Sequence, residues 1–316
     1  MISFRYHVVS LVAVLLALAI GIVLGGGPLQ RDESRADEPA APAELDAAEQ
    51  TITAQDSLLA FGDSYADRTA SVLVGDRLAD RAVTMLMLPG AEEEVAGRIA
   101  EMVSVAGGEV TARVDVSADL LDVGNRQLVD ELGTQMYDEA RKDVEVPTGV
   151  SGYERIGRLL AHALGTTQDA GEAMDRTAEG IRAAVATAEL VTTRGEVDRR
   201  GSLVVVVAGA PQGTADQRSG AGSVLSSLVD ALDNGTDGVV VTGPLAASAE
   251  DGLVAAVRTD AVAGSHVSTV DVADRVAGAV ATVLAIAEQG DGGSGHYGSG
   301  EAGDGALPVS GAPAGD

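Results

Sequence analysis

Between residues 81 and 289, short apolar runs alternate with amphipathic segments, which is the pattern of a sheet whose strands are joined by helices. The run AVTMLMLPG (82–90) is followed by a segment with an acidic first turn and helical spacing, and then by the alternating run EVTARVDVS (109–117). Because a strand, a helix and a strand in succession normally pair their strands in parallel through a right-handed crossover, we expect a parallel sheet.

The same pattern resumes after a long helical stretch. Residues 120–191 show several helical segments and no convincing strand, which predicts an inserted helical region. Strands are then expected at 202–210, 237–244 and 265–270, each followed by a helix. Val204 to Val207 is apolar on both faces, as in a central strand covered by helices on each side. The predicted fold is α/β, a three-layer domain with a mostly parallel sheet of about five strands.

Residues 8–24 form an uncharged apolar run broken only by Ser10 and Gly21. With the glycines that follow, the stretch reaches about 20 residues, the length that a helix needs to cross a hydrocarbon core. Arg5 precedes the run and acidic residues follow it, so the N-terminus is expected in the cytoplasm and the rest of the chain outside. Residues 1–27 are therefore predicted to be a transmembrane signal anchor, with a cleaved signal peptide as the alternative.

Two further segments have the composition of flexible chain. Residues 28–43 combine prolines with alternating charge, which predicts a flexible spacer. Residues 290–316 are rich in glycine, serine and alanine, which predicts a disordered tail.

Residues 44–80 are predicted to be helical in two parts, the second from about 67 to 80. The first part carries a heptad pattern, and we call its five core positions the heptad seam: Leu45, Ala48, Ile52, Gln55 and Leu59. Two heptads predict a short coiled-coil helix that pairs with a copy of itself, and an ordinary amphipathic helix is the alternative. The chain is accordingly expected to form a homo-oligomer or to bind other envelope proteins.

The formal net charge of −27 excludes whole classes of partner. Nucleic acids and anionic lipid headgroups are bound by basic patches, so neither is an expected ligand. The chain has no cysteine, which excludes disulfides, thiolate metal sites and thiol nucleophiles. The exported domain must therefore be stabilised by packing alone.

The segment FGDSYAD (61–67) resembles the nucleophile block of GDSL/SGNH hydrolases, in which the serine attacks an ester and a histidine acts as its base. In those enzymes the block follows a core strand, whereas the residues before it here have a helical pattern. The chain also contains no Asp-x-x-His to supply a base and its orienting acid. We therefore expect a connection between two helices and no enzymatic activity, with hydrolysis by Ser64 as the alternative.

The loops at 209–222 and 242–248 are the predicted place for a small ligand, if the domain binds one. Both leave the carboxyl ends of neighbouring strands, where open α/β sheets bind their ligands. Gly220 and Gly222 resemble part of a dinucleotide loop, but the third glycine is missing, so a flexible loop is the favoured interpretation. No cofactor is predicted.

Met85 and Met87 are two residues apart on an expected strand, so both thioethers face one side of the sheet. Thioethers suit soft Cu(I), which makes this pair the weak candidate for a metal site. Packing in the core is the favoured interpretation, because methionine fills irregular apolar space and no Met-rich tract or paired-histidine motif accompanies the pair.

The leader MISFRYHVVSLVAVLLALAIGIVLGGGPL resembles that of the mycobacterial copper transport protein B family of actinobacteria, in its basic residue, His7, Val-Ser-Leu and glycine-ended apolar run. The rest of the chain also resembles this family, over residues from about 75 to 290. LADRAVTMLMLPGAEEEVAGRIAEMVSVAGGEVTARVDVS has a strand ending in proline, an acidic helix start and a second strand preceded by two glycines. The resemblance implies a cell-envelope protein, described for the family as a copper transport or pore-forming outer-membrane protein that limits intracellular copper. It carries no metal ligands onto numbered positions of this chain.

The function predicted from the sequence is a membrane-anchored envelope protein that supports copper efflux or homeostasis. One helix would lie in the inner membrane, and an acidic α/β domain outside would act through partners. A pore would require several N-terminal helices to assemble, and residues 8–24 carry no polar stripe to line one. The alternatives are an exported hydrolase that uses Ser64 and a noncatalytic ligand-binding sensor that uses the loops at 209–222 and 242–248.

Overall fold

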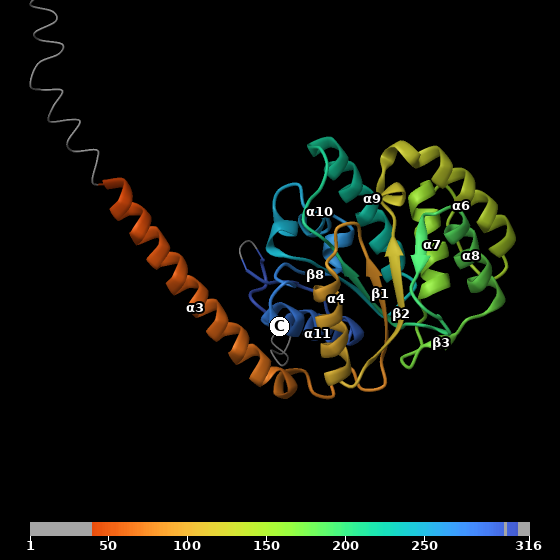
Figure 1. Ribbon diagram of the computed structural model, residues 1–316. Coiled ribbons are helices and arrows are strands. Elements are labelled where there is room, and N and C mark those ends of the chain that lie inside the picture. Colours follow the sequence, from red (N-terminus) through yellow and green to blue (C-terminus); the bar gives the residue numbers. More distant parts are fainter. Residues whose placement is uncertain (1–39, 300–301, 309–316) are drawn as a thin grey trace, which may run out of the picture. The chain divides into compact units, whose positions relative to one another are not determined.

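The computed structural model of the 316-residue chain describes residues 40–299 and 302–308. The chain divides into two compact units, Met1–Phe61 and Gly62–Asp316, and the second holds the α/β body (Figure 1). The predicted membrane helix at 8–24 lies outside the described residues. In the part of the chain that the structure describes, no helix combines the length and the hydropathy of a membrane span.

A seven-stranded sheet forms the centre of the body, in the order β4-β2-β1-β6-β7-β8-β9. Its strands are β1 (Ala82–Met87), β2 (Glu109–Val116), β4 (Val191–Thr193), β6 (Leu203–Val207), β7 (Gly238–Thr242), β8 (Ser268–Val270) and β9 (His296–Tyr297). Neighbouring strands run parallel except β2 and β4, which are antiparallel. The mostly parallel sheet predicted from the alternating pattern is confirmed, with short strands β4 and β9 added at its two edges.

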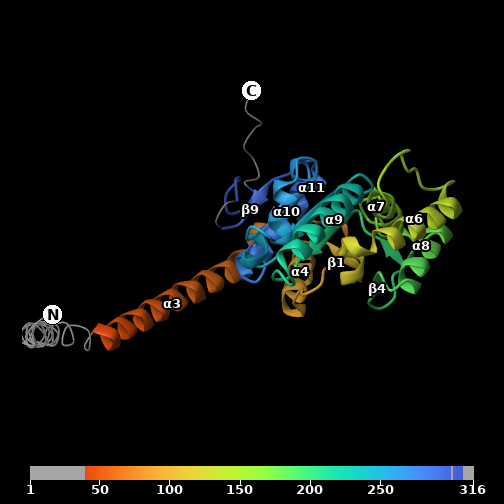
Figure 2. The same ribbon diagram turned by 90° about the horizontal axis from the view of Figure 1, so that it is seen from above.

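Helices cover both faces of the sheet and enclose two hydrophobic cores (Figure 2). The covering helices are α4 (Glu93–Val105), α9 (Ala215–Asp233), α10 (Leu253–Thr259) and α11 (Val276–Gly290), with short 3-10 turns at Val123–Asn125, Leu245–Ser248 and Ala263–Ser265. Val204 and Val206 of β6 lie in the core under α9, whereas Val205 and Val207 lie in the core under α4 and α11. β6 is therefore a central strand that is apolar on both faces, as its sequence predicts.

A layer of further helices covers the α9 side of the sheet. They are α5 (Ala118–Leu121), α6 (Arg126–Ala140), α7 (Gly152–Leu164) and α8 (Arg176–Thr187), and they lie where the sequence predicts an inserted helical region. Ile156 and Val185 belong to the same core as Val204, so this layer packs as part of the domain. The region also contains β3 (Glu172–Ala173), which pairs with β5 (Arg199–Arg200) in a small antiparallel sheet that the sequence does not predict.

α3 is one continuous helix over Ala40–Val74 (Figure 1). The predicted flexible spacer therefore does not extend to residue 43, and FGDSYAD (61–67) is not a connection between two helices. The second predicted helical part, 67–80, is the end of α3 as far as Val74, where the helix ends. Gly62 is tolerated inside the helix because a mid-helix glycine costs only about 1 kcal/mol relative to alanine.

The predicted disordered tail is corrected over its first ten residues. His296–Tyr297 forms β9, which pairs parallel with β8 at the edge of the sheet. Tyr297 is buried, and its hydroxyl donates to Glu288 Oε2 at 2.6 Å. One aromatic side chain with a place in the core therefore orders a stretch whose glycine-rich composition predicts disorder.

Candidate functional site

The sheet has a topological switch point between β1 and β6. The chain leaves β1 toward β2 on one side and leaves β6 toward β7 on the other, so the loops after these strands diverge. Open α/β sheets bind ligands in such a crevice at the carboxyl ends of the strands. Glycine allows the two loops to pass closely, because a Cβ atom on Gly209 would overlap the backbone of Gly90, which itself has a φ of 82°.

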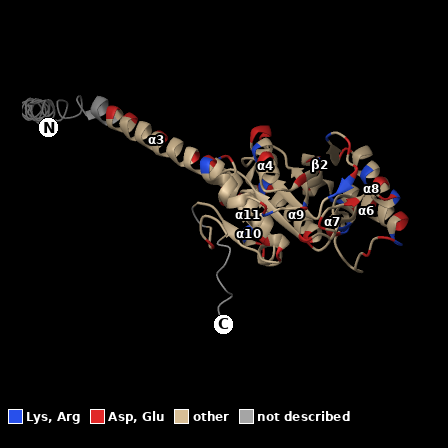
Figure 3. Cartoon of the chain, turned by 90° about the horizontal axis from the view of Figure 1, so that it is seen from below, with Lys and Arg blue, Asp and Glu red and all other residues tan. Residues whose placement is uncertain are grey.

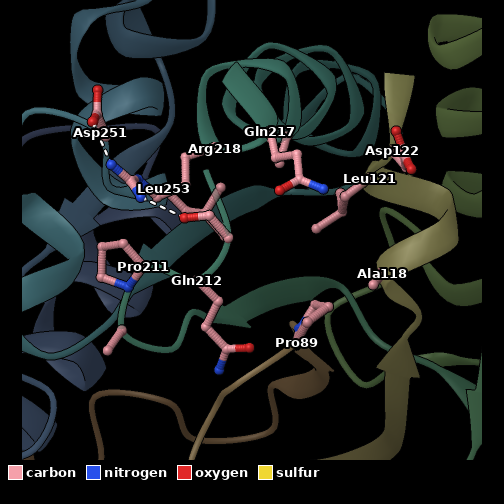
Figure 4. Close-up of a pocket in the computed structure, with 13 residues that line it drawn as sticks. Pro89, Ala118, Leu121, Asp122, Pro211, Gln212, Gln217, Arg218, Asp251 and Leu253 are labelled. Carbon is pink, nitrogen blue, oxygen red and sulfur yellow. Dashed lines mark hydrogen bonds and ion pairs between the residues drawn. The ribbon is translucent and has the colours of Figure 1, made fainter. Parts of the chain in front are cut away.

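A cavity of about 250 Å³, which we call the switch-point cavity, lies at this crevice (Figure 4). Its walls come from the loop after β1, from α5, from the loop after β6 with the start of α9, and from the segment at the start of α10. The lining residues are Pro89, Ala118, Leu121, Asp122, Ala210, Pro211, Gln212, Gly213, Gln217, Arg218, Ala221, Asp251 and Leu253. Residues far apart in the sequence thus meet at one place.

The start of α9 forms one wall and is fixed by a capping box. Thr214 Oγ1 accepts a hydrogen bond from Gln217 N at 3.4 Å, and Gln217 Oε1 accepts one from Thr214 N at 2.9 Å. These reciprocal bonds define where the helix begins. They therefore also set the position of the next residue, Arg218, on the cavity wall.

Arg218 carries the positive charge of the switch-point cavity. Its Nη2 atom lies 2.7 Å from Asp251 Oδ2, and its Nη1 atom donates to Gly213 O at 2.7 Å. The Nε atom of Arg218 is buried and has no hydrogen-bond partner among the described residues. Because Asp251 neutralises the guanidinium, the cavity offers hydrogen-bond donors more than net positive charge.

Apolar side chains form much of the remaining wall, notably Pro89, Leu121 and Leu253, while Gln212 and Gln217 supply amide groups (Figure 4). Small-molecule sites typically combine apolar walls with a few placed polar groups. No histidine, serine, cysteine or lysine occurs among the residues that line the cavity. The lining therefore supports binding of a small molecule and supplies no pair of a nucleophile and a histidine base.

The structure brings together part of the predicted ligand region. The predicted loop at 209–222 contributes a large share of the lining, whereas 242–248 does not line this cavity. The flexible-loop interpretation of Gly220 and Gly222 is wrong, because α9 begins at Ala215 and contains both glycines. The opposite wall, around Leu121, is absent from the sequence prediction. It could not be found there, because the position of β2 beside β1 and of β1 beside β6 is set by the strand order of the whole sheet.

Ser64, the other predicted candidate, is an exposed residue inside α3. The three histidines of the described ranges form their hydrogen bonds and ion pairs elsewhere: His162 with Asp175, His266 with Asp230 and Asp233, and His296 with Thr269 and Gly264. The structure therefore does not bring Ser64 together with a histidine that could act as its base.

Met85 and Met87 lie in the same hydrophobic core, which confirms that they face one side of the sheet. Their exposed fractions are 0% and 4%, and α4 and α11 cover them. Met102 of α4 belongs to this core as well. Among residues 40–299 and 302–308, no group of three or more histidine or acidic side chains is arranged to hold a metal ion.

A set of paired charges lies at the amino end of β6, which is the opposite end of the sheet. We call Arg200, Glu172, Asp175 and His162 the amino-edge cluster. The Arg200 guanidinium lies 2.8 Å from Glu172 Oε2 and 3.2 Å from Asp175 Oδ2, and its Nη1 atom donates to His162 O at 3.1 Å. The Arg200 side chain is only 5% exposed. These bonds tie β5 to α7, to β3 and to the chain between β3 and α8.

Two aspartates near the amino edge of the sheet have pKa values shifted in opposite directions. Burial raises the pKa of Asp175, but the hydrogen bond from Ala178 N and the charges of His162 and Arg200 outweigh it, so the pKa is lowered. Burial also raises the pKa of Asp233, and there the opposing charge of His266 and the bond from Val239 N are too weak to reverse it.

Comparison with known proteins identifies the family of this chain. The description "Copper transport outer membrane protein, MctB" belongs to the family that matches residues 1–308. Over 317 residues, the chain is 27% identical to the copper transporter MctB of Mycobacterium tuberculosis (strain ATCC 25618 / H37Rv), with 98% of this chain and 99% of the relative covered. The copper transporter MctB of Mycobacterium leprae (strain TN) is 26% identical over 318 residues, with 95% and 97% covered. These matches confirm the resemblance of the leader and the first strands, and the chain belongs to the MctB family of copper transport outer membrane proteins.

Proposed function

We propose that this chain supports copper handling in the cell envelope as a single-pass anchored protein, with its N-terminus in the cytoplasm and its α/β body outside. The observation that carries the proposal is the extent of the family match, which runs from residue 1 to residue 308 and so includes both the apolar run at 8–24 and the body. The length and flanking charges of that run are those of a membrane anchor.

The body is proposed to act through protein partners and not by catalysis or by holding copper in its core. The positions of Met85 and Met87 support this, because both thioethers are used in packing between β1 and the helices that cover it. The position of Ser64 supports it as well, since this residue is exposed on a helix and the described histidines are engaged elsewhere.

The membrane in which the protein lies is a separate part of the proposal. The family description names the outer membrane. The apolar run at 8–24 favours an inner-membrane anchor, because it has the form of a helical span with a basic residue before it. Separation of the two membranes, followed by detection of the full chain in each fraction, distinguishes these locations.

Side-chain labelling tests the topology, because the chain has no cysteine of its own. A single cysteine at Ser104, which is exposed on α4, should react with a membrane-impermeant maleimide in intact cells whose outer layer has been permeabilised. A cysteine at Ser3 should react only after the inner membrane is opened. Equal labelling of both positions, or the reverse order, would contradict the proposed orientation.

Copper binding and copper tolerance test the role of the body. We expect the full chain to restore copper tolerance to a strain that lacks its own copy. The Met85→Leu/Met87→Leu variant should restore it equally, because leucine preserves the apolar packing. Competition with a chromophoric Cu(I) chelator under reducing conditions gives the second measurement. Stoichiometric Cu(I) binding that this variant loses would overturn the packing role and make the pair a metal site.

A second candidate function is noncatalytic binding of a small molecule in the switch-point cavity. Its support is the cavity itself, which combines apolar walls, two side-chain amides and the neutralised Arg218 at a switch point of the sheet. Melting-temperature shifts with a panel of small molecules test it. A shift that Ala221→Trp abolishes, and that Ala215→Trp on the exposed start of α9 keeps, would support binding in the cavity.

A further inference from the structure

The heptad seam on α3 is an apolar stripe that the described structure leaves uncovered. Leu45, Ile52 and Leu59 are 60%, 56% and 51% exposed. Residues 45–60 are exposed throughout in the part of the chain that the structure describes. Further along the same helix, Ala70 and Val74 are buried in a core.

An uncovered helix of this kind is expected to need a partner. Isolated helices shorter than about 12–15 residues are marginal in water even for alanine-rich sequences, and residues 45–60 include β-branched and polar side chains that form helices less well than alanine. Burial of a leucine or isoleucine side chain contributes roughly 1.5–3 kcal/mol. Pairing of the three large seam residues would therefore supply stability that the helix otherwise lacks.

The polar member of the seam indicates what the partner is. Gln55 lies at a core position between Ile52 and Leu59. A glutamine amide both donates and accepts hydrogen bonds, so in a parallel pair of identical helices Gln55 meets Gln55 of the second copy and each satisfies the other. A single polar residue at a core position sets the register and the number of strands in coiled coils. The seam is thus complementary to itself.

The polar core residue also selects the direction of pairing. In a parallel pair Gln55 meets Gln55, whereas antiparallel helices place the two kinds of core position against each other, so Gln55 would face an apolar seam residue and its amide would be buried without a partner. The acidic residues beside the seam, Glu44 and Glu49 on opposite flanks, do not favour either direction. Figure 3 shows acidic residues along α3, whose first basic residue is Arg68.

We propose that residues 45–59 of α3 pair with the same segment of a second copy of this chain in a parallel, two-stranded coiled coil. The seam residues form the core of the pair, and Gln55 fixes its register. This inference does not depend on a role in copper handling, because it rests only on the exposure and spacing of the seam residues and on Gln55.

Disulfide cross-linking of the full-length chain in isolated cell envelopes tests the pairing. The absence of native cysteines allows a single cysteine to report on one position. In a parallel pair the two copies of Ala48 are adjacent, so oxidised Ala48→Cys should give most of the chain as a covalent dimer. Gln50→Cys, on the outward face of the helix, is the matched control and should give only a background band.

A second test places charged residues in the heptad seam. Ile52→Glu/Leu59→Glu, introduced beside Ala48→Cys, should abolish the cross-linked dimer because four carboxylates would be buried in one core. Gln50→Glu/Ser57→Glu adds the same charge on the outward face and should leave the dimer intact. The proposal is overturned if Ala48→Cys remains monomeric, as it would with an unrelated or antiparallel partner. Equal cross-linking at Gln50→Cys, or a dimer that survives Ile52→Glu/Leu59→Glu, would overturn it too.

Discussion

The two ends of the central sheet are built in opposite ways. At the carboxyl ends of β1 and β6, the strand order sends two loops to opposite sides and Gly209 lets them pass closely. Beside them lies the switch-point cavity, which contains one neutralised arginine. At the amino end of β6, the amino-edge cluster places the buried Arg200 between two carboxylates. The carboxyl end has a cavity with apolar walls that suits a small ligand. At the amino end, paired charges hold the helical layer to the sheet, and the same charged side chains line a polar cavity of about 360 Å³.

The largest expected effect concerns the close approach at the carboxyl end. Gly209→Ala should lower the free energy of unfolding by about 3 kcal/mol, because the new methyl group would overlap the backbone of Gly90 and neither loop can move without shifting a strand end. Urea denaturation of the purified chain measures this change.

Gly97 on α4 provides the matched control for that substitution. A Cβ atom there has no neighbour within 4 Å, so Gly97→Ala should raise the free energy of unfolding by about 0.5–1 kcal/mol through helix propensity alone. Equal, small effects at both glycines would show that the loops at the switch point are not held closely together.

The second prediction compares the stability contributions of the arginines at the two ends of the sheet. Arg200→Ala should cost about 2–3 kcal/mol of unfolding free energy, because its side chain is buried and its loss leaves two carboxylates and a carbonyl without their donor. Arg218→Ala should cost less than about 1 kcal/mol, since the Arg218 side chain is 26% exposed and pairs with one carboxylate, whereas that of Arg200 is 5% exposed and pairs with two. Thermal unfolding of both variants checks the order, and a larger cost at Arg218 would reverse the comparison.

The capping box at the start of α9 should contribute an intermediate amount to the free energy of unfolding. Thr214→Ala removes the acceptor of the capping box and should lower the free energy of unfolding by about 1 kcal/mol. Ser219→Ala, at an exposed position on the same helix, should have almost no effect. Denaturant titrations of the two variants measure the difference, and equal costs would mean that the box does not define the helix start.

The smallest expected effects are the pH dependences of two aspartates. The lowered pKa of Asp175 means that its charged form stabilises the fold above its ordinary value of 3.8, and that this contribution disappears as the pH falls through the folded-state pKa. Asp175→Asn should therefore be less stable than the parent at pH 7, and the difference should vanish in acid.

Asp233 should behave in the opposite way. Its raised pKa means that the charged form destabilises the fold at neutral pH, and that the cost is relieved as the pH falls through the folded-state pKa. Asp233→Asn, which keeps an acceptor for Val239 N, should match or slightly exceed the parent at pH 7 and lose this advantage in acid. Melting temperatures between pH 3 and pH 7 test both aspartates, and parallel curves would remove the distinction between them.

Local patterns in the chain were sufficient for several features of the fold and the candidate site. The alternation of apolar runs and amphipathic segments predicts the mostly parallel sheet, and the valines of β6 predict a strand covered on both faces. The spacing of Met85 and Met87 predicts that they share a face. Each of these depends on a period of two or 3.6 residues, which neighbouring residues reveal by themselves.

The structure decided the features that join distant parts of the chain. Strand order brings Leu121 and Arg218 to the same cavity. Burial of Tyr297 in the core orders part of a glycine-rich stretch. Arg200 has three partners only because β3, the residues after it, β5 and α7 converge. The sequence by itself determined the elements and the faces they bury, since periodicity is local. Only the tertiary structure decided the cavity, the edge strands and the charged cluster, because these depend on contacts between residues far apart in the chain.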